Sequence, residues 1–107
     1  MYDMKKLKQL KKVGELAPDA FNAFQAFDKA VFAEGTIPIK YKELIALGVA
    51  LTTQCVYCIE VHRRAALKAG ATEAEMAEAA LVAAALRAGG AITHAAHLMP
   101  EDPPPAS

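Results

Sequence analysis

The chain has two cysteines in 107 residues, Cys55 and Cys58, and they are three positions apart. In a Cys-x-x-Cys arrangement the two thiols are close enough in sequence to form a disulfide with each other. The pair follows the polar residues 52–54 and precedes a helical pattern, so we expect it at a helix N-terminus. There the helix dipole and the free backbone N–H groups lower the pKa of a thiol. The spacing therefore predicts a redox-active dithiol.

A histidine and a glutamate are spaced to assist this dithiol. On a helix, positions 55, 58 and 62 share one face, so His62 can take the thiol proton of Cys58 directly or through one water. If two consecutive helices form an antiparallel hairpin that turns near Thr53, Glu43 lies level with His62. A buried carboxylate is costly unless it is paired, which predicts that Glu43 orients His62. Periodicity alone leaves open a second reading, in which Glu43 is exposed near the start of its helix, where acidic residues are favoured.

A zinc site is the alternative use of the same residues. The two cysteines and His62 could supply three ligands, with His94 or His97 as the fourth. Structural zinc usually takes a second ligand pair at knuckle spacing on loops, and this chain has no second cysteine pair. We therefore predict no metal and no other cofactor, and we keep a zinc-stabilised helical scaffold or interaction protein without redox catalysis as the alternative.

Charge and hydropathy limit the class of protein. Lysine plus arginine and aspartate plus glutamate number 12 each, so the net charge is +0 and gives no attraction to nucleic acid or an anionic membrane. Five lysines within residues 5–12 indicate a solvated helix face. No secretory signal pattern is present, and the longest uncharged stretch, 44–59, is too short and interrupted to span a bilayer. We expect a single-domain cytoplasmic protein, in which a Cys-x-x-Cys pair is catalytic rather than structural.

The hydrophobic periodicity, together with helix start and stop residues, predicts an all-α fold, a compact bundle of about six helices. Residues 79–86 are apolar at every position, so they need cover from their own chain or from partner subunits, and we expect an oligomer. The Pro-rich tail 100–107 is expected to be disordered. The expected helices span 2–13 (ended by Gly14), 18 to about 34 (ended by Gly35), 38–51, 54–69, 72–88 (opened by a capping box at Thr72 and Glu75, broken by Gly89-Gly90) and 91–99.

The stretch from Glu43 through Cys55-Val-Tyr-Cys58-Ile-Glu-Val-His62 to Thr72 resembles the carboxymuconolactone decarboxylase superfamily, in particular its alkyl hydroperoxidase D-like branch. Its pattern is Glu-x11-Cys-x2-Cys-x3-His, and the resemblance extends over residues 38–98. It implies one helical domain over residues 1–99, assembled as a homotrimer or homohexamer. It also implies a thiol-dependent peroxidase or disulfide reductase acting on a small hydroperoxide, regenerated by a thiol or protein reductant that the sequence does not identify.

The same resemblance implies roles for the site residues. Cys58 would be the peroxide-attacking thiolate and Cys55 the resolving thiol, with Glu43 and His62 as the proton relay. Tyr57 stands where related hydroperoxidases often carry a histidine; its ring can pack, or its hydroxyl can bind a substrate oxygen. The decarboxylase branch lacks the dithiol, so lactone chemistry is not expected.

Overall fold

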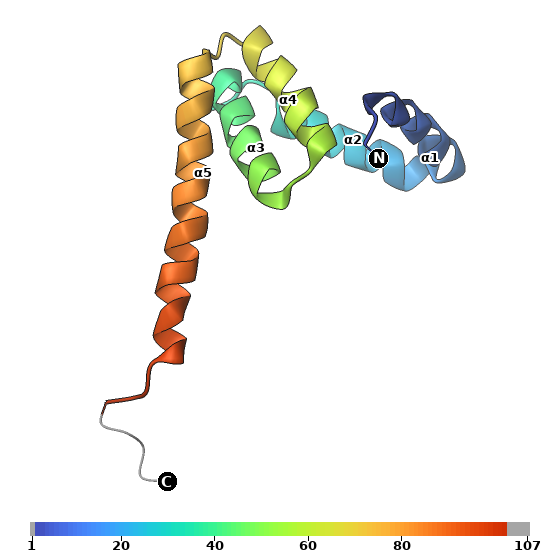
Figure 1. Cartoon of the computed structure of the whole chain (residues 1–107). Helices are drawn as coiled ribbons and strands as arrows, with labels where there is room; N and C mark the ends of the chain where they lie inside the picture. The colour runs from blue at the N-terminus through green and yellow to red at the C-terminus, as the bar shows by residue number, and fades with distance from the viewer. Residues whose placement is uncertain (1, 103–107) are drawn as a thin grey trace.

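The structure is a computed structural model, and it describes residues 2–102. Every regular element in this range is a helix, so the all-α class is confirmed (Figure 1). The elements in chain order are the 3-10 helix η1 (Met4–Gln9), α1 (Leu10–Leu16), α2 (Pro18–Val31), α3 (Ile39–Thr53), α4 (Val56–Lys68), α5 (Glu73–His94) and the 3-10 helix η2 (Ala95–Leu98).

The packed centre of the chain is formed by α3, α4 and the first half of α5. α4 returns antiparallel beside α3, and α5 packs along α3 as well (Figure 1). The core is small, because most of its members are alanines or lie only partly buried. Its residues are Leu47, Ala50, Ala66 and Ala71, with Leu44 and Met76 against them.

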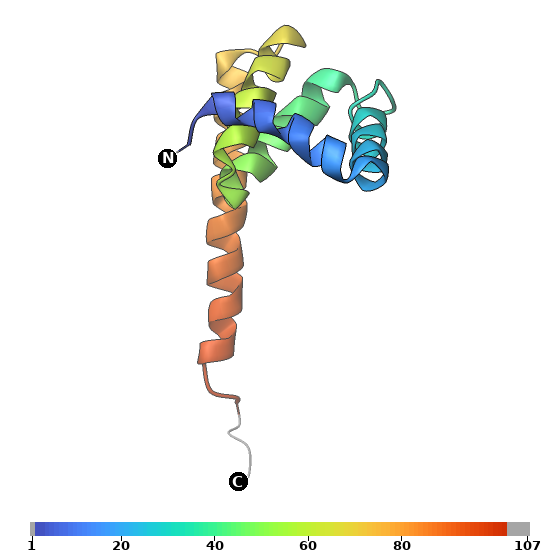
Figure 2. The same cartoon turned by 90° about the vertical axis from the view of Figure 1, so that its right-hand side faces the viewer.

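The remaining elements extend away from this centre. α1 and α2 pack on each other to one side of this centre (Figure 1), and the second half of α5 projects alone beyond the other helices (Figure 2). The radius of gyration is 19.4 Å, whereas a compact chain of this length has about 13 Å. The single chain is therefore elongated rather than the compact bundle we expected. The physical reason is that the second half of α5 has no neighbouring helix within the described residues, while α1 and α2 pack mainly on each other.

α5 is one continuous helix where the sequence predicted a break at Gly89-Gly90. Each glycine weakens a helix by roughly 1 kcal/mol relative to alanine, but it keeps its N–H group, so the hydrogen-bond ladder can continue. The alanines and leucine before the glycines favour the helix. The predicted last helix, 91–99, is the end of α5 followed by η2. At the other end, the predicted capping box of Thr72 and Glu75 is present.

The sequence predicted that Gly14 ends the first helix, but this glycine lies inside α1. A Cβ at this position would come within 2.7 Å of Cδ1 of Phe21. The glycine therefore lets the Phe21 ring of α2 approach the α1 backbone. α2 in turn ends at Val31, before the predicted stop at Gly35. Residues 100–102 have no regular structure, and the rest of the predicted disordered tail, 103–107, lies outside the described residues.

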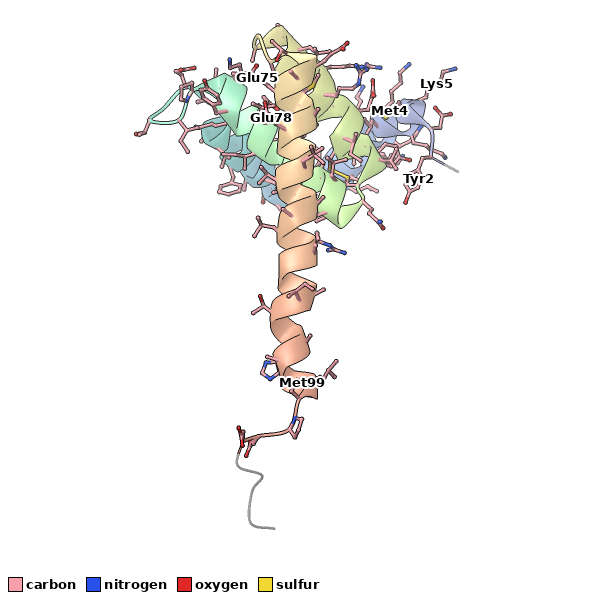
Figure 3. All side chains as sticks on the ribbon, turned by 60° about the vertical axis from the view of Figure 1, so that its left-hand side comes forward. Tyr2, Met4, Lys5, Glu75, Glu78 and Met99 are labelled. Atoms are coloured by element: carbon pink, nitrogen blue, oxygen red, sulfur yellow. A yellow bond between two sulfur atoms is a disulfide. The ribbon has the colours of Figure 1, made fainter. Side chains whose placement is uncertain are left out.

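The segment Glu73–Leu98 is long and apolar enough to cross a membrane, with a mean hydropathy of 1.3 in an 18-residue window. This segment, and not 44–59, is the one that meets the length requirement. One helix of this kind is a weak indication, because core helices of soluble proteins meet the same criteria. Figure 3 shows its course from Glu75, beside the other helices, to the isolated Met99.

Candidate active site

Cys55 and Cys58 lie in the first turn of α4, at the helix N-terminus that the sequence predicted. α3 ends at Thr53, and Gln54 takes the left-handed conformation (φ 57°), so the chain turns back and Cys55 becomes the N-cap of α4. The Cys58 N–H donates to Cys55 Sγ at 3.2 Å, which satisfies one of the free N–H groups of the first turn. The two cysteines form a disulfide, with Cα atoms 5.2 Å apart. The structure therefore shows the oxidised state of the pair.

Glu43 on α3 and His62 on α4 lie opposite each other in the hairpin, as the sequence predicted. His62 Nδ1 lies 2.6 Å from Glu43 Oε1. Glu43 is only 5% exposed, so the reading in which it is a surface residue is wrong. With Glu43 as a carboxylate, which can only accept, His62 Nδ1 is the donor of this hydrogen bond. That tautomer leaves Nε2 as the ring nitrogen available to another partner.

The disulfide and the imidazole open on one groove with a volume of about 480 Å³. Cys58 and His62 both line it, whereas Cys55 does not. Of the two cysteines, Cys58 is therefore the one that a molecule in this groove can contact. The rest of the wall is mostly apolar and comes from the end of α2, the following loop and α3: Val31, Phe32, Ile37, Ile45, Ala46, Val49 and Ala50.

Two further side chains of the groove were not predicted from the sequence. The Phe32 ring stacks on His62, with centroids 5.0 Å apart and an interplanar angle of 24°. Lys42 Nζ donates to the carbonyl oxygens of Val31 at 2.7 Å and Ala33 at 2.6 Å. The one sequence signal was a lysine directly before Glu43, at the start of an apolar helix. No pattern indicated that this lysine reaches the end of α2.

On another face of α4, Glu60 binds two arginines. Its carboxylate accepts hydrogen bonds from Arg63 Nη2 at 2.6 Å and Arg64 Nε at 2.8 Å. These bonds lower the pKa of Glu60 to about 2, so it stays ionised at any working pH. The two guanidinium charges are thus partly balanced within their own helix.

Residues 18–101, from the start of α2 past the end of η2, match the sequence profile of the Carboxymuconolactone decarboxylase family. This chain belongs to that family. The match includes all four residues of the disulfide and the Glu43–His62 pair, and it confirms the superfamily that the Glu-x11-Cys-x2-Cys-x3-His pattern indicated.

Two bacterial proteins similar to this chain are uncharacterized. It is 49% identical over 74 residues to uncharacterized protein 4 in the cox locus of Paracoccus denitrificans, covering 69% of this chain and 67% of that protein. It is 37% identical over 71 residues to an uncharacterized protein of Cupriavidus necator, covering 66% and 63%. The chain thus spans about two thirds of the length of these two relatives.

Two solved structures share the fold of this family member. A protein from Methanobacterium thermoautotrophicum has a TM-score of 0.75 at 39% identity, covering 79% of this chain and 96% of that one. A carboxymuconolactone decarboxylase family protein from Legionella pneumophila, crystallised in its apo form, has a TM-score of 0.74 at 30% identity, covering 86% and 82%. The arrangement of helices is therefore that of known family members.

Tyr57, the candidate substrate-binding residue, contacts the N-terminal segment. Its ring lies edge-on to Tyr2, with centroids 5.5 Å apart and an interplanar angle of 73°. Tyr57 is not among the residues that line the groove. The packing role is thus present in the structure, and a contact with substrate stays a prediction.

The histidines considered for a zinc site lie elsewhere. His94 is the last residue of α5 and His97 lies in η2, with ring centroids 5.9 Å apart, and His94 Nδ1 lies 2.8 Å from the carbonyl oxygen of Gly90. Within residues 2–102 no three His, Cys, Asp or Glu side chains gather in a group that could hold a metal ion. The four-ligand arrangement considered for zinc is therefore not assembled within this part of the chain.

Proposed function

We propose that this protein is a thiol-dependent peroxidase or disulfide reductase that cycles Cys55 and Cys58 between dithiol and disulfide. The observation that carries the proposal is the groove that the exposed Cys58 and His62 share. Nδ1 of this histidine binds the buried Glu43. A nucleophile, a base and a group that orients the base are the parts that activated-thiol catalysis requires. Membership of the family agrees with this chemistry.

In the first step the reduced enzyme attacks the hydroperoxide. His62 Nε2 takes the thiol proton of Cys58, while Nδ1–H stays bonded to Glu43. The Cys58 thiolate attacks the terminal oxygen of ROOH, and the O–O bond breaks as the S–O bond forms. Cys58 becomes a sulfenic acid, and the imidazolium returns its proton to the departing alkoxide, which leaves as ROH.

In the second step Cys55 resolves the sulfenic acid. Its sulfur attacks the sulfur of Cys58, a disulfide forms and water leaves. Both cysteines lie at the start of α4, and their Cα separation of 5.2 Å is within the usual range for a disulfide. An external dithiol then supplies two electrons and two protons. The hydrogen bond from the Cys58 N–H to Cys55 Sγ favours attack of the external thiolate at Cys58, because it stabilises the Cys55 thiolate that leaves when the disulfide breaks.

The direct test is a titration of the reduced protein with an alkyl hydroperoxide while free thiols are counted. One equivalent of oxidant should remove both thiols of each chain and yield one equivalent of alcohol. If both thiols persist in excess oxidant, the redox function is excluded. Metal analysis of the purified protein tests the alternative, since a zinc-stabilised scaffold would carry stoichiometric zinc.

We also propose that the subunits form a homotrimer or homohexamer through α5. An apolar hollow of about 480 Å³ lies between α3 and α5, lined by residues that include Leu44, Val49 and Val82. Farther along α5, Leu86 and Ile92 are 70% and 76% exposed. Apolar surface on this scale is typical of contacts between subunits. The same surface would explain the elongated shape of the single chain.

The proposed location is the cytoplasm. Reducing compartments keep thiols free, so a Cys-x-x-Cys pair there can cycle rather than stay oxidised. The balanced net charge offers no general attraction to nucleic acid or to an anionic membrane. A small hydroperoxide and a thiol or protein reductant remain the proposed partners.

A further inference from the structure

The end of α2 is held by a lysine from another helix. Lys42, on α3, donates through Nζ to the carbonyl oxygens of Val31 and Ala33, the residues on either side of Phe32. The last carbonyls of a helix have no partner within the helix, and hydrogen bonds from a charged donor are stronger than neutral ones. α2 packs mainly on α1 and has little contact with the α3–α4 hairpin. The two Lys42 bonds therefore tie the end of α2 to α3.

Phe32, between those two carbonyls, lies against the face of the His62 ring. The rings stack with an interplanar angle of 24°. The hydrogen bond from Nδ1 to Glu43 opposes rotation of the imidazole about its Cβ–Cγ bond. The Phe32 ring lies against the face of the imidazole and opposes the same rotation sterically, so both contacts restrict the direction of Nε2. A base must be held within hydrogen-bond reach of the proton it takes.

We propose that Lys42 and Phe32 are positioning residues for His62: Lys42 fixes the end of α2, and Phe32 then holds the imidazole so that Nε2 is directed into the groove of Cys58. All four residues line that groove. The inference rests on the proposed role of His62 as the base for Cys58. Neither Lys42 nor Phe32 touches the reacting sulfur in this scheme; both act through the imidazole.

The first experiment observes the imidazole itself in the oxidised protein, by NMR of protein with ¹⁵N-labelled histidine. The wild type should show a slowly exchanging Nδ1–H signal for His62. Phe32→Leu, which keeps an apolar side chain without the stack, and Lys42→Met, which keeps the stem without the ammonium, should lose it. Phe32→Tyr should keep it. Lys40→Met is the matched control, since Lys40 is a neighbouring α3 lysine that pairs with Glu75 instead.

The second experiment measures alkylation of the reduced protein by iodoacetamide across pH. Phe32→Leu and Lys42→Met should slow the reaction near neutral pH by about tenfold, a part of the ~10²–10⁴ that a positioned base contributes. Their rate profiles should shift to higher pH, whereas Phe32→Tyr and Lys40→Met should follow the wild type. A merely structural role would lower thermal stability without moving the profile.

Wild-type NMR signals and pH profiles in both Phe32→Leu and Lys42→Met would overturn the inference. If Lys42→Met does not fold, as judged by circular dichroism, the contrast between leucine and tyrosine at position 32 decides; if Phe32→Leu does not fold, Lys42→Met against Lys40→Met decides. Failure of the proposed function has a different signature. A wild type that consumes no hydroperoxide excludes the peroxidase, while the NMR signal still reports whether Lys42 and Phe32 hold His62.

Discussion

Glu43 and His62 are nineteen positions apart in the chain, and their side chains meet at 2.6 Å in the α3–α4 hairpin. Glu43 is the one buried charged residue in the described part of the chain. Burying a carboxylate is costly, so an unpaired Glu43 would be strongly unfavourable at this position. The pair thus joins α3 to α4 at one level of the hairpin and holds Nδ1 of the imidazole.

Removing either member of this pair should slow the thiol chemistry. In Glu43→Gln the imidazole loses its carboxylate partner, and in His62→Ala the base is absent. Alkylation of the reduced protein near neutral pH should slow by about tenfold or more in each variant, and the profile should move to higher pH. Unchanged rates and profiles in both variants would refute the relay but leave the dithiol chemistry untouched.

The two cysteines should respond differently to replacement. In Cys55→Ser the sulfenic acid formed on Cys58 has no resolving thiol, so it should persist and react with dimedone, adding one label per chain. In Cys58→Ser the attacking thiol is absent, so dimedone labelling should be lost. Mass spectrometry of each variant after one equivalent of hydroperoxide measures both outcomes. Labelling of Cys55 in Cys58→Ser, with none in Cys55→Ser, would reverse the assignment of the two roles.

Assembly should be visible in solution. Light scattering at micromolar concentration should report about three or six times the subunit mass of 11.4 kDa. Leu86→Asp places a charge on the exposed apolar side of α5 and should lower the measured mass. Leu16→Asp serves as the control, because Leu16 is 76% exposed on α1, and it should leave the measured mass unchanged. A monomeric wild type would show that α5 stays uncovered or is covered in another way.

The capping box at the start of α5 should make stability depend on pH. The backbone N–H of Thr72 and the ammonium of Lys40 lower the pKa of Glu75 from its ordinary value of 4.5. A lowered folded-state pKa means that the stabilisation is complete above 4.5 and is lost as pH falls through the folded pKa. Between about pH 5 and about pH 3, the melting temperature of the wild type should therefore fall more than that of Glu75→Gln.

The hydroxyl in the same box can be tested separately. Thr72 Oγ1 accepts the backbone N–H of Glu75 at 3.1 Å. Thr72→Ala removes this acceptor and should destabilise the fold by about 1 kcal/mol. Thr72→Ser keeps the hydroxyl and should cost much less. Urea unfolding of the three proteins measures the difference, and equal midpoints for alanine and threonine would show that the cap contributes nothing.

The sequence by itself determined the features that depend on near neighbours along the chain. The helical class follows from periodicity, and the capping box of α5 follows from the types and spacing of a few residues. The position of Cys55 and Cys58 at a helix N-terminus was readable for the same reason, because a polar turn precedes a helical run. To predict that Glu43 lies opposite His62, we also had to assume a hairpin. In a regular antiparallel pair of helices, residues at equal distances from the turn lie opposite each other, so the position can be counted along the chain.

Tertiary structure alone decided which distant elements meet. That Lys42 reaches the end of α2, and that Phe32 stacks on His62, depends on how α2 lies against the hairpin, which no local pattern specifies. The burial of Glu43, which periodicity left open, was settled by packing between helices. At Gly89-Gly90 a local pattern gave a wrong prediction. Two glycines lower local helix propensity, but helix formation is cooperative, so α5 continues through them as one helix.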